Sequence, residues 1–252
     1  MTLDGRHAVV TGGGRGIGRA IAAALSAAEA TVTVVGRSAA ALEETADEGD
    51  AHHYVVADVT DAQALGDGLK RAAAKHGMID ILVANAGGAE SAPFTKTEPD
   101  LFRKMFELNV MGTVHAMQAV IGDMTARRSG RIVAIASTAG LKGYTYVSAY
   151  CAAKHAVVGL VRALAAETAT SGVTVNAVCP GYTDTELVRD SVARLAQRTG
   201  RSRQDILAEM LKDNPLGRLV RPEEVAAAVL FLCSPEAAAV TGMALTVAGG
   251  EI

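Results

Sequence analysis

The sequence predicts an α/β fold, a doubly wound parallel sheet of about seven strands with helices on both faces. Three observations support this prediction. Short β-branched and apolar runs alternate with helical patterns, the connections between them are short, and a glycine cluster directly follows the first apolar run. No repeat, linker or low-complexity tract divides the 252 residues, so we expect one domain spanning 1–252.

The composition is that of an ordinary globular protein. Half of the residues are apolar, and 24 Lys and Arg against 27 Asp and Glu give a net charge of -3, which argues against nucleic acid as a partner. The three cysteines lack metal-ligand spacing, so we expect no metal site and a reducing compartment. The chain starts with no basic and apolar leader, and no apolar run approaches membrane-span length. We therefore expect a cytoplasmic protein without a membrane partner.

The first expected strand, His7–Val10, runs into a glycine cluster at 11–18, and a helical pattern follows from Arg19 to Ala28. Strand, glycine turn and helix form the arrangement in which backbone and helix amino end approach a phosphate. The spacing fits T-G-x-x-x-G-x-G rather than the G-x-G-x-x-G of many dinucleotide sites. A Rossmann-type dinucleotide site is therefore expected here, formed by Gly12, Arg15, Gly16, Ile17 and Gly18.

The second expected strand, Thr31–Val35, ends at Gly36-Arg37. An acidic residue at this point would bind the ribose 2′-hydroxyl of NAD. Gly36 cannot repel a 2′-phosphate, and Arg37 can pair with one, with Arg15 of the glycine loop as a second partner. The sequence therefore favours NADP(H) as cofactor and leaves NAD(H) open.

The next elements alternate in the same way. A helix is expected over Ser38–Glu48 with its first residue as N-cap, then a third strand over His53–Ala57 and a helix over Asp61–His76. Asp58 and Val59 follow the third strand. Asp58 could accept a hydrogen bond from the adenine amino group, so both residues join the expected cofactor site.

The fourth expected strand, Asp80–Ala84, leads to Asn85-Ala86-Gly87, where small residues would let a cofactor ribose approach the backbone. One long helix is then expected from Glu98 to Asp123, with Asn109 near its middle. Asparagine is a weak helix former, so a solvent-facing side chain and a functional role are both open.

Ser137, Tyr150 and Lys154 form the expected catalytic centre. The serine follows a fifth strand, Gly130–Ala136, and the other two stand four residues apart at the start of a helix over Ser148–Thr170, hence on one face. A free phenol has a pKa of about 10. An ammonium group about 5 Å away would lower that pKa by about 2 units at an effective dielectric of about 20. We therefore expect Lys154 to prepare Tyr150 for proton transfer. Taken alone, the pair also fits a surface tyrosine and a solvated lysine.

The sixth expected strand, Val173–Val178, is followed by a turn and by charged helical stretches over Glu186–Asn214. Such an insertion at the carboxyl edge of a sheet is typical of a substrate lid, expected at about 182–215. A last helix over Pro222–Cys233 and a last strand over Met243–Val247 complete the chain. The strand ends gather at one edge of a parallel sheet, where such sheets bind ligands.

In this order, the motifs resemble the short-chain dehydrogenase/reductase family over almost the whole chain, from Thr11 to Gly250. Ala84 departs from the family pattern, which usually has a second asparagine there. That asparagine is chiefly structural. The shared motifs are Thr11-Gly12-x-x-x-Gly16-x-Gly18, Asn85-Ala86-Gly87, Asn109, Ser137, Tyr150-x-x-x-Lys154 and Pro180-Gly181-x-x-x-Thr185.

The resemblance implies a role for each residue. Tyr150 would be the general acid in reduction and the base in oxidation, and Ser137 would hydrogen-bond the substrate carbonyl. Lys154 would lower the pKa of the tyrosine and bind the nicotinamide ribose. Asn109 would hold a water molecule through its main chain and extend a proton relay.

The resemblance also bears on the cofactor, the substrate and the assembly. Pro180, Gly181, Thr183 and Thr185 would hold the nicotinamide end, and Gly36-Arg37 resembles members that prefer NADP(H). The ending Ala248-Gly249-Gly250 resembles 3-oxoacyl thioester reductases and 3-hydroxyacyl dehydrogenases. These are usually homotetramers, which suits the two apolar faces of the helix that carries Tyr150; a homodimer is the other expectation.

The predicted function is therefore NADP(H)-dependent interconversion of a ketone and a secondary alcohol, with a 3-oxoacyl thioester of acyl carrier protein or CoA as substrate. Two alternatives remain open. One is an NAD(P)-dependent dehydrogenase of a small, sugar or cyclic secondary alcohol, and the other is a catalytically silent nucleotide-binding regulator.

Overall fold

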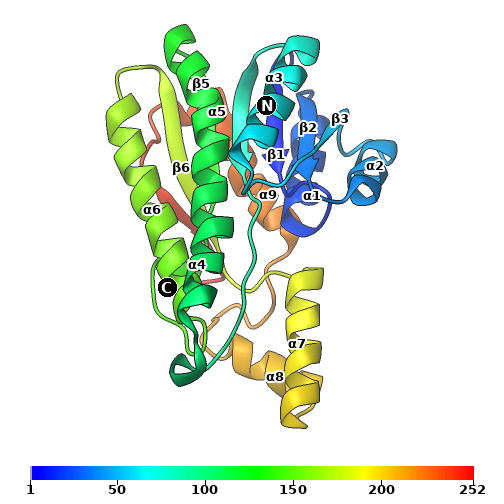
Figure 1. The fold of residues 1–252 in the computed structure, drawn as a ribbon, viewed down its shortest axis with the longest axis vertical. Helices are drawn as coiled ribbons and strands as arrows, with labels where there is room; N and C mark the ends of the chain where they lie inside the picture. The colour runs from blue at the N-terminus through cyan, green and yellow to red at the C-terminus, as the bar shows by residue number, and fades with distance from the viewer. Residues whose placement is uncertain (1) are drawn as a thin grey trace.

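The computed structural model describes residues 2–252, which form one sheet between two layers of helices (Figure 1). Every strand pair is parallel, and the order across the sheet is β3-β2-β1-β4-β5-β6-β7. The predicted doubly wound α/β fold is confirmed. The strands are β1 His7–Thr11, β2 Thr31–Gly36, β3 His53–Val56, β4 Ile79–Ala84, β5 Gly130–Ile135, β6 Val173–Pro180 and β7 Ala244–Val247.

The strand order reverses between β1 and β4, which lie side by side although β2 and β3 separate them in the sequence. In parallel sheets of this topology, such a reversal leaves a crevice at the carboxyl ends of the two strands, and ligands bind there. The central strands are buried runs of Val, Ile and Ala, as both faces of a covered parallel sheet require.

Helices cover both faces of the sheet. One apolar cluster joins α1 and α9 to the sheet through residues such as Ile21 and Val225, and a second joins α3, α5 and α6 through Leu69, Met117 and Val161. The helices are α1 Gly16–Ala27, α2 Ala39–Asp47, α3 Ala62–His76, α4 Pro99–Phe106, α5 Gly112–Arg127, α6 Ser148–Thr168, α7 Glu186–Thr199, α8 Arg203–Leu211 and α9 Pro222–Cys233.

One predicted helix is not continuous in the structure. The single helix expected over 98–123 is interrupted by a π-helical turn, η2 Glu107–Met111, between α4 and α5. A π-turn inserts an extra residue into the helical repeat and rotates the side chains around it. Asn109 lies in this turn and is fully buried, so it does not face solvent. Periodicity alone does not reveal such a turn.

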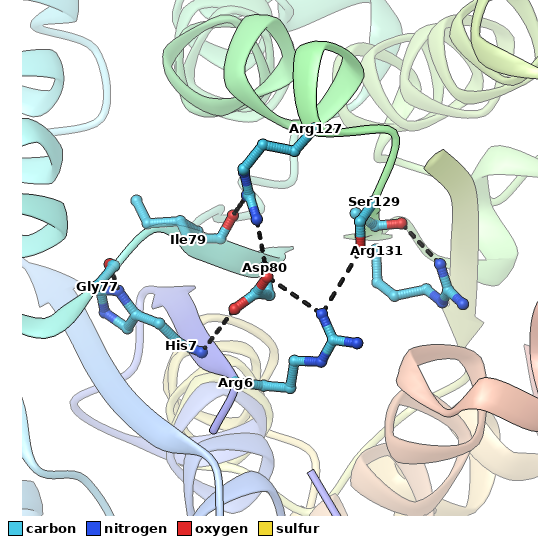
Figure 2. A network of polar contacts seen from close by, with 9 residues as sticks. Arg6, His7, Gly77, Ile79, Asp80, Arg127, Ser129 and Arg131 are labelled. Carbon is cyan, nitrogen blue, oxygen red and sulfur yellow. Dashed lines mark hydrogen bonds and ion pairs between the residues drawn. The ribbon is translucent and has the colours of Figure 1, made fainter. Parts of the chain in front are cut away.

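The amino edge of the sheet, opposite the crevice, is held by a polar network around Asp80 (Figure 2). Its carboxylate accepts hydrogen bonds from Arg6 at 3.3 Å, Arg127 at 3.0 Å and the backbone N–H of His7 at 3.1 Å. Arg127 also donates to the carbonyl of Ile79 at 2.8 Å. The network joins β1, β4 and the end of α5.

Helix α6 is long and apolar enough to cross a membrane by length and composition. Its sheet-facing residues, among them Val157 and Val161, are nevertheless buried in the core cluster. The helix therefore serves as a core helix of this fold, and its apolar character follows from packing against the sheet.

Candidate active site

The expected catalytic side chains converge at the carboxyl end of β5. Ser137 begins a short 3₁₀ turn, η3 Thr138–Gly140, directly after the strand. Tyr150 and Lys154 lie one turn apart at the start of α6, and the Nζ atom of Lys154 is 5.7 Å from the centroid of the Tyr150 ring. Lys154 is 5 % exposed and donates a hydrogen bond of 2.8 Å to the carbonyl of Ile135. The alternative of a solvated lysine is therefore excluded.

Ser137 and Tyr150 bring two hydroxyl groups together. Burial raises the pKa of Tyr150 to about 12, while a polar contact with the Ser137 side chain acts in the opposite direction. The Oγ atom of Ser137 accepts a hydrogen bond from the backbone N–H of Ala139 at 3.1 Å, which leaves the serine proton free to be donated. At neutral pH the phenol is protonated, so it can give a proton to a bound ketone.

The predicted lowering of the Tyr150 pKa by Lys154 is wrong for the protein alone. Burial raises the pKa of the phenol and lowers that of the Lys154 ammonium group to about 8. Both shifts have one cause, because a low-dielectric interior disfavours the charged form of each group. Charge alone would lower the pKa of the phenol in a partly solvated pair, but here desolvation outweighs it.

Asn109 organises the loop that follows β4. Its Oδ1 atom accepts from the N–H of Gly88 at 3.2 Å, and its Nδ2 atom donates to the carbonyls of Gly88 and Met105, each at 3.0 Å. A Cβ atom on Gly87 would lie 2.7 Å from this Oδ1 atom and 3.5 Å from the Lys154 Nζ atom. Asn109, Gly87 and Lys154 thus meet in one tight cluster. The water-holding role of the Asn109 main chain stays a prediction.

The glycine loop is a tight turn that requires glycine at several positions. Gly12 and Gly16 have φ angles of +66° and +54°, which favour glycine, and a Cβ atom on Gly18 would lie 2.2 Å from the Gly12 carbonyl oxygen. Within the described chain no side chain caps α1, and its first turn holds no acidic residue. Its free N–H groups and positive end fit a dinucleotide pyrophosphate.

Asn85 fixes this loop against β4. Its Nδ2 atom donates to the carbonyls of Thr11 at 3.0 Å and Gly12 at 3.2 Å, and the N–H of Ala86 donates to the Thr11 Oγ1 atom at 3.0 Å. Two other residues predicted for the cofactor site, Ile17 and Val59, make packing contacts instead. Ile17 packs on the core beneath the loop, and Val59 is buried with its carbonyl accepting from His115.

The two arginines predicted to hold a 2′-phosphate have exposed side chains. Arg37 is 72 % exposed in its side chain, with a guanidinium nitrogen 3.7 Å from Asp58. Arg15 is 76 % exposed, with a nitrogen 3.7 Å from Glu186 at the start of α7. Hydrogen bonds from Thr60, followed by the charge of Arg37, lower the pKa of Asp58. Both guanidinium groups are loosely held and can turn toward an anion.

The segment after β6 closes the other end of the site. Pro180 ends β6, and the buried Thr183 donates to the carbonyl of Gly181 at 3.0 Å. The Cγ2 atom of Thr185 would lie 3.3 Å from a Cβ atom on Gly16. The start of α7 therefore rests on the glycine loop, which brings the two expected halves of the cofactor site together.

Beside Ser137 lies a polar group that includes Glu251, a residue for which the sequence predicts no role. Tyr144 and Tyr182 pack edge to face with ring centroids 6.1 Å apart, and Glu251 receives a hydrogen bond from Tyr144. Two cations that could meet an anionic substrate are already paired with carboxylates, Lys142 with Glu251 at 3.3 Å and Arg189 with Asp184 at 3.0 Å. Only the tertiary fold brings residue 251 beside residue 144.

Comparison with known proteins agrees with this geometry. The family model of short chain dehydrogenases matches residues 6–196. The chain is 40 % identical over 250 residues to cis-4-hydroxycyclohexanecarboxylate dehydrogenase of Sinomonas cyclohexanicum, covering 97 % of this chain and 96 % of that protein. It is 38 % identical over 248 residues to acetoacetyl-CoA reductase of Shinella zoogloeoides, covering 98 % of each.

A solved structure has the same fold. A single-residue variant of actinorhodin polyketide ketoreductase with NADPH superposes with a TM-score of 0.94 at 34 % identity, covering 100 % of this chain and 99 % of that one. Fold, site geometry and relatives lead to one conclusion. The chain belongs to the short-chain dehydrogenase family and is an NAD(P)(H)-dependent oxidoreductase that interconverts a secondary alcohol and a ketone.

Proposed function

We propose that the protein reduces a 3-oxoacyl thioester of CoA or acyl carrier protein to its 3-hydroxy form with NADPH. The observation that carries this proposal is apolar surface on the loops around the site. The large side chains Phe94, Tyr146 and Leu187 are 72 %, 65 % and 49 % exposed. The N–H of Ala92 donates to the carbonyl of Tyr146 at 2.8 Å, so two of these loops lie together. Exposed apolar surface of this kind suits an acyl chain.

The relatives support the same substrate class. Besides the acetoacetyl-CoA reductase, a 3-oxoacyl-[acyl-carrier-protein] reductase of Vibrio harveyi is 37 % identical over 254 residues. A polyketide ketoreductase is the structural neighbour with NADPH. The charge pattern adds a constraint, because Lys142 and Arg189 are already paired. The thioester's anionic carrier would therefore need other partners.

In the proposed reaction the protein orients the ketone and supplies a proton. The bound cofactor would supply the hydride. Ser137 donates a hydrogen bond to the carbonyl oxygen and stabilises the charge that develops there. Tyr150, protonated at neutral pH, gives its phenolic proton to the same oxygen. Lys154, fixed on the Ile135 carbonyl one turn from the phenol, would bind the nicotinamide ribose.

The cofactor preference is tested at Arg37. We expect Arg37→Ala to weaken NADPH binding by about tenfold to hundredfold, since a charged hydrogen bond contributes about 1.5–3 kcal/mol. NADH lacks the 2′-phosphate, so its binding should change little. Titration of both cofactors into both proteins measures this. Equal weakening of the two would contradict the NADP(H) preference.

A second candidate function is oxidation of a cyclic or sugar secondary alcohol. The edge-to-face pair of Tyr144 and Tyr182 beside Tyr150 would suit a compact ring. Two relatives at 40 % identity are a hydroxycyclohexanecarboxylate dehydrogenase and a galactitol 2-dehydrogenase. A panel of 3-oxoacyl thioesters, cyclic ketones, cyclic alcohols and polyols, each assayed with both cofactors, separates the two candidates. A clear preference in kcat/KM for ring alcohols or polyols over thioesters would reject the first.

The proposal includes a lid and an assembly. Helices α7 and α8 lie beyond the carboxyl ends of the strands, as the yellow and orange helices of Figure 1, and we infer that 182–215 closes over substrate. We also infer a homotetramer. The outer face of α6 carries exposed small residues, among them Ala152, Gly159 and Ala163, which allow close approach of another helix.

A further inference from the structure

Glu251 forms a polar latch with three residues of the loop that follows Ser137. We use the term C-terminal latch for Thr138, Lys142, Tyr144 and Glu251. The Tyr144 hydroxyl donates to the Glu251 Oε1 atom and lies 2.7 Å from the Thr138 Oγ1 atom. The ammonium group of Lys142 lies 3.3 Å from the Glu251 Oε1 atom and donates to the Glu251 main-chain carbonyl at 3.0 Å.

The directions of these hydrogen bonds follow from the chemistry of the groups. A carboxylate only accepts, so the proton of the Tyr144 hydroxyl points to Glu251. The Thr138 hydroxyl must then donate to the Tyr144 oxygen. The result is an ordered chain of hydrogen bonds from Thr138 to Tyr144 to Glu251. Thr138 is the residue that follows Ser137 in the sequence. Thr138 is itself buried, at 3 % exposure.

Burying the carboxylate of Glu251 costs free energy. Its side chain is 2 % exposed, and its Oε2 atom has no hydrogen-bond partner among the described residues. A Cβ atom on Gly181 would lie 3.1 Å from this oxygen. Burying a charge is unfavourable unless its partners repay the lost hydration. A buried carboxylate beside the site, with one oxygen unpartnered among the described residues, points to a role beyond packing.

We propose that Glu251 is a positioning residue for catalysis, acting through Tyr144 and Thr138 to hold the turn that presents the Ser137 hydroxyl. The inference rests on the proposed role of Ser137 and does not depend on which ketone is the substrate. Because the turn Thr138–Gly140 is only three residues long, a fixed Thr138 side chain restrains the Ser137 backbone directly. Tyr144 also packs on Tyr182, which extends the restraint to the segment after β6.

The test compares Glu251→Ala, Glu251→Gln and Tyr144→Phe, with Ile252→Ala as the control at an exposed neighbour. We expect Glu251→Ala and Tyr144→Phe each to lower kcat by about tenfold to hundredfold, the scale of a small misplacement in an active site. KM and the Kd of NADPH should stay close to those of the parent protein. Glu251→Gln should recover most of kcat, because its amide oxygen can still accept the Tyr144 proton. The double variant Tyr144→Phe, Glu251→Ala should be no worse than either single variant.

An optical measurement separates positioning from general loss of structure. Burial and the bond to Glu251 raise the pKa of Tyr144 above its usual range. The chain contains no Trp and only five Tyr, so tyrosinate absorbance is readily followed. In Glu251→Ala one tyrosine should ionise at lower pH, and Tyr144→Phe should remove that transition. A Glu251→Ala protein with unchanged kcat, or with kcat lost together with NADPH binding, would overturn the inference.

One further variant, Ser137→Ala, tells this failure from failure of the site itself. If Ser137→Ala keeps full kcat, the proposed role of Ser137 is wrong and the latch has nothing to position. If Ser137→Ala is impaired and the latch variants are not, only the latch is rejected. Should Glu251→Ala fail to fold, Tyr144→Phe carries the test, because it breaks the ordered chain and leaves the pairing of Glu251 with Lys142.

Discussion

Tyr150 is the residue on which the proposed proton transfer depends. The residue is partly exposed, and its phenol contacts Ser137 and has a pKa raised to about 12. We expect Tyr150→Phe to lower kcat at least about hundredfold, because the general acid is lost while the ring remains. NADPH binding, measured by titration, should persist, since the substitution removes only one hydroxyl. Turnover at the parent rate would eliminate this mechanism.

The buried Lys154 should make the stability of the folded protein depend on pH. Burial lowers its pKa from 10.5 to about 8, so between these values the folded protein has released a proton that the unfolded chain still binds. The free energy of unfolding should therefore rise with pH across this range through Lys154. A Lys154→Met variant has no such group. The difference in unfolding free energy, parent minus variant, should increase from pH 8 to pH 10. A flat difference would show that the amine is not desolvated.

The element that receives the cofactor is the turn between β1 and α1. A Cβ atom at Gly18 would meet the Gly12 carbonyl oxygen at 2.2 Å, and this backbone atom cannot move without opening the turn. We expect Gly18→Ala to abolish tight NADPH binding and to destabilise the fold by about 1–3 kcal/mol.

Gly66→Ala in α3 is the matched control for this substitution. Its added methyl group meets no described atom within 4 Å, and its helical position favours alanine. We expect it to stabilise the protein by about 0.5–1 kcal/mol and to leave cofactor binding unchanged. Denaturant unfolding and cofactor titration on both variants check the contrast. Equal effects of the two would mean that close backbone approach at Gly18 is unimportant.

At the scale of the whole molecule, the exposed small residues of α6 lead to the assembly prediction. We expect size-exclusion chromatography with light scattering to give the mass of a homotetramer. Ala163→Arg, which places a bulky charge on the outer face of α6, should shift it to a smaller species. Ala40→Arg on the exposed face of α2 is the control and should leave the oligomeric state unchanged. A monomer at micromolar concentration would contradict this expectation.

Much of the fold was predictable because its signals are local. The N-cap of α2 at Ser38 and the bounds Pro222–Cys233 of α9 follow the prediction, as does the parallel sheet. Buried strands are continuous β-branched runs, and short connections allow few topologies. The π-turn around Asn109 was not predictable, because it depends on the bonds of that side chain to the loop after β4.

The sequence alone determined the order of the motifs, the strand ends on which they stand and hence the family and its reaction class. These follow from spacing along the chain, since side chains after parallel strands collect at one edge. The tertiary structure decided how charged each group can be and which distant residues meet. Burial raised the pKa of Tyr150 where charge alone predicted the opposite, and folding brought Glu251 to Tyr144 across more than a hundred residues. Desolvation and long-range contact depend on the whole packed molecule, and no window of sequence contains them.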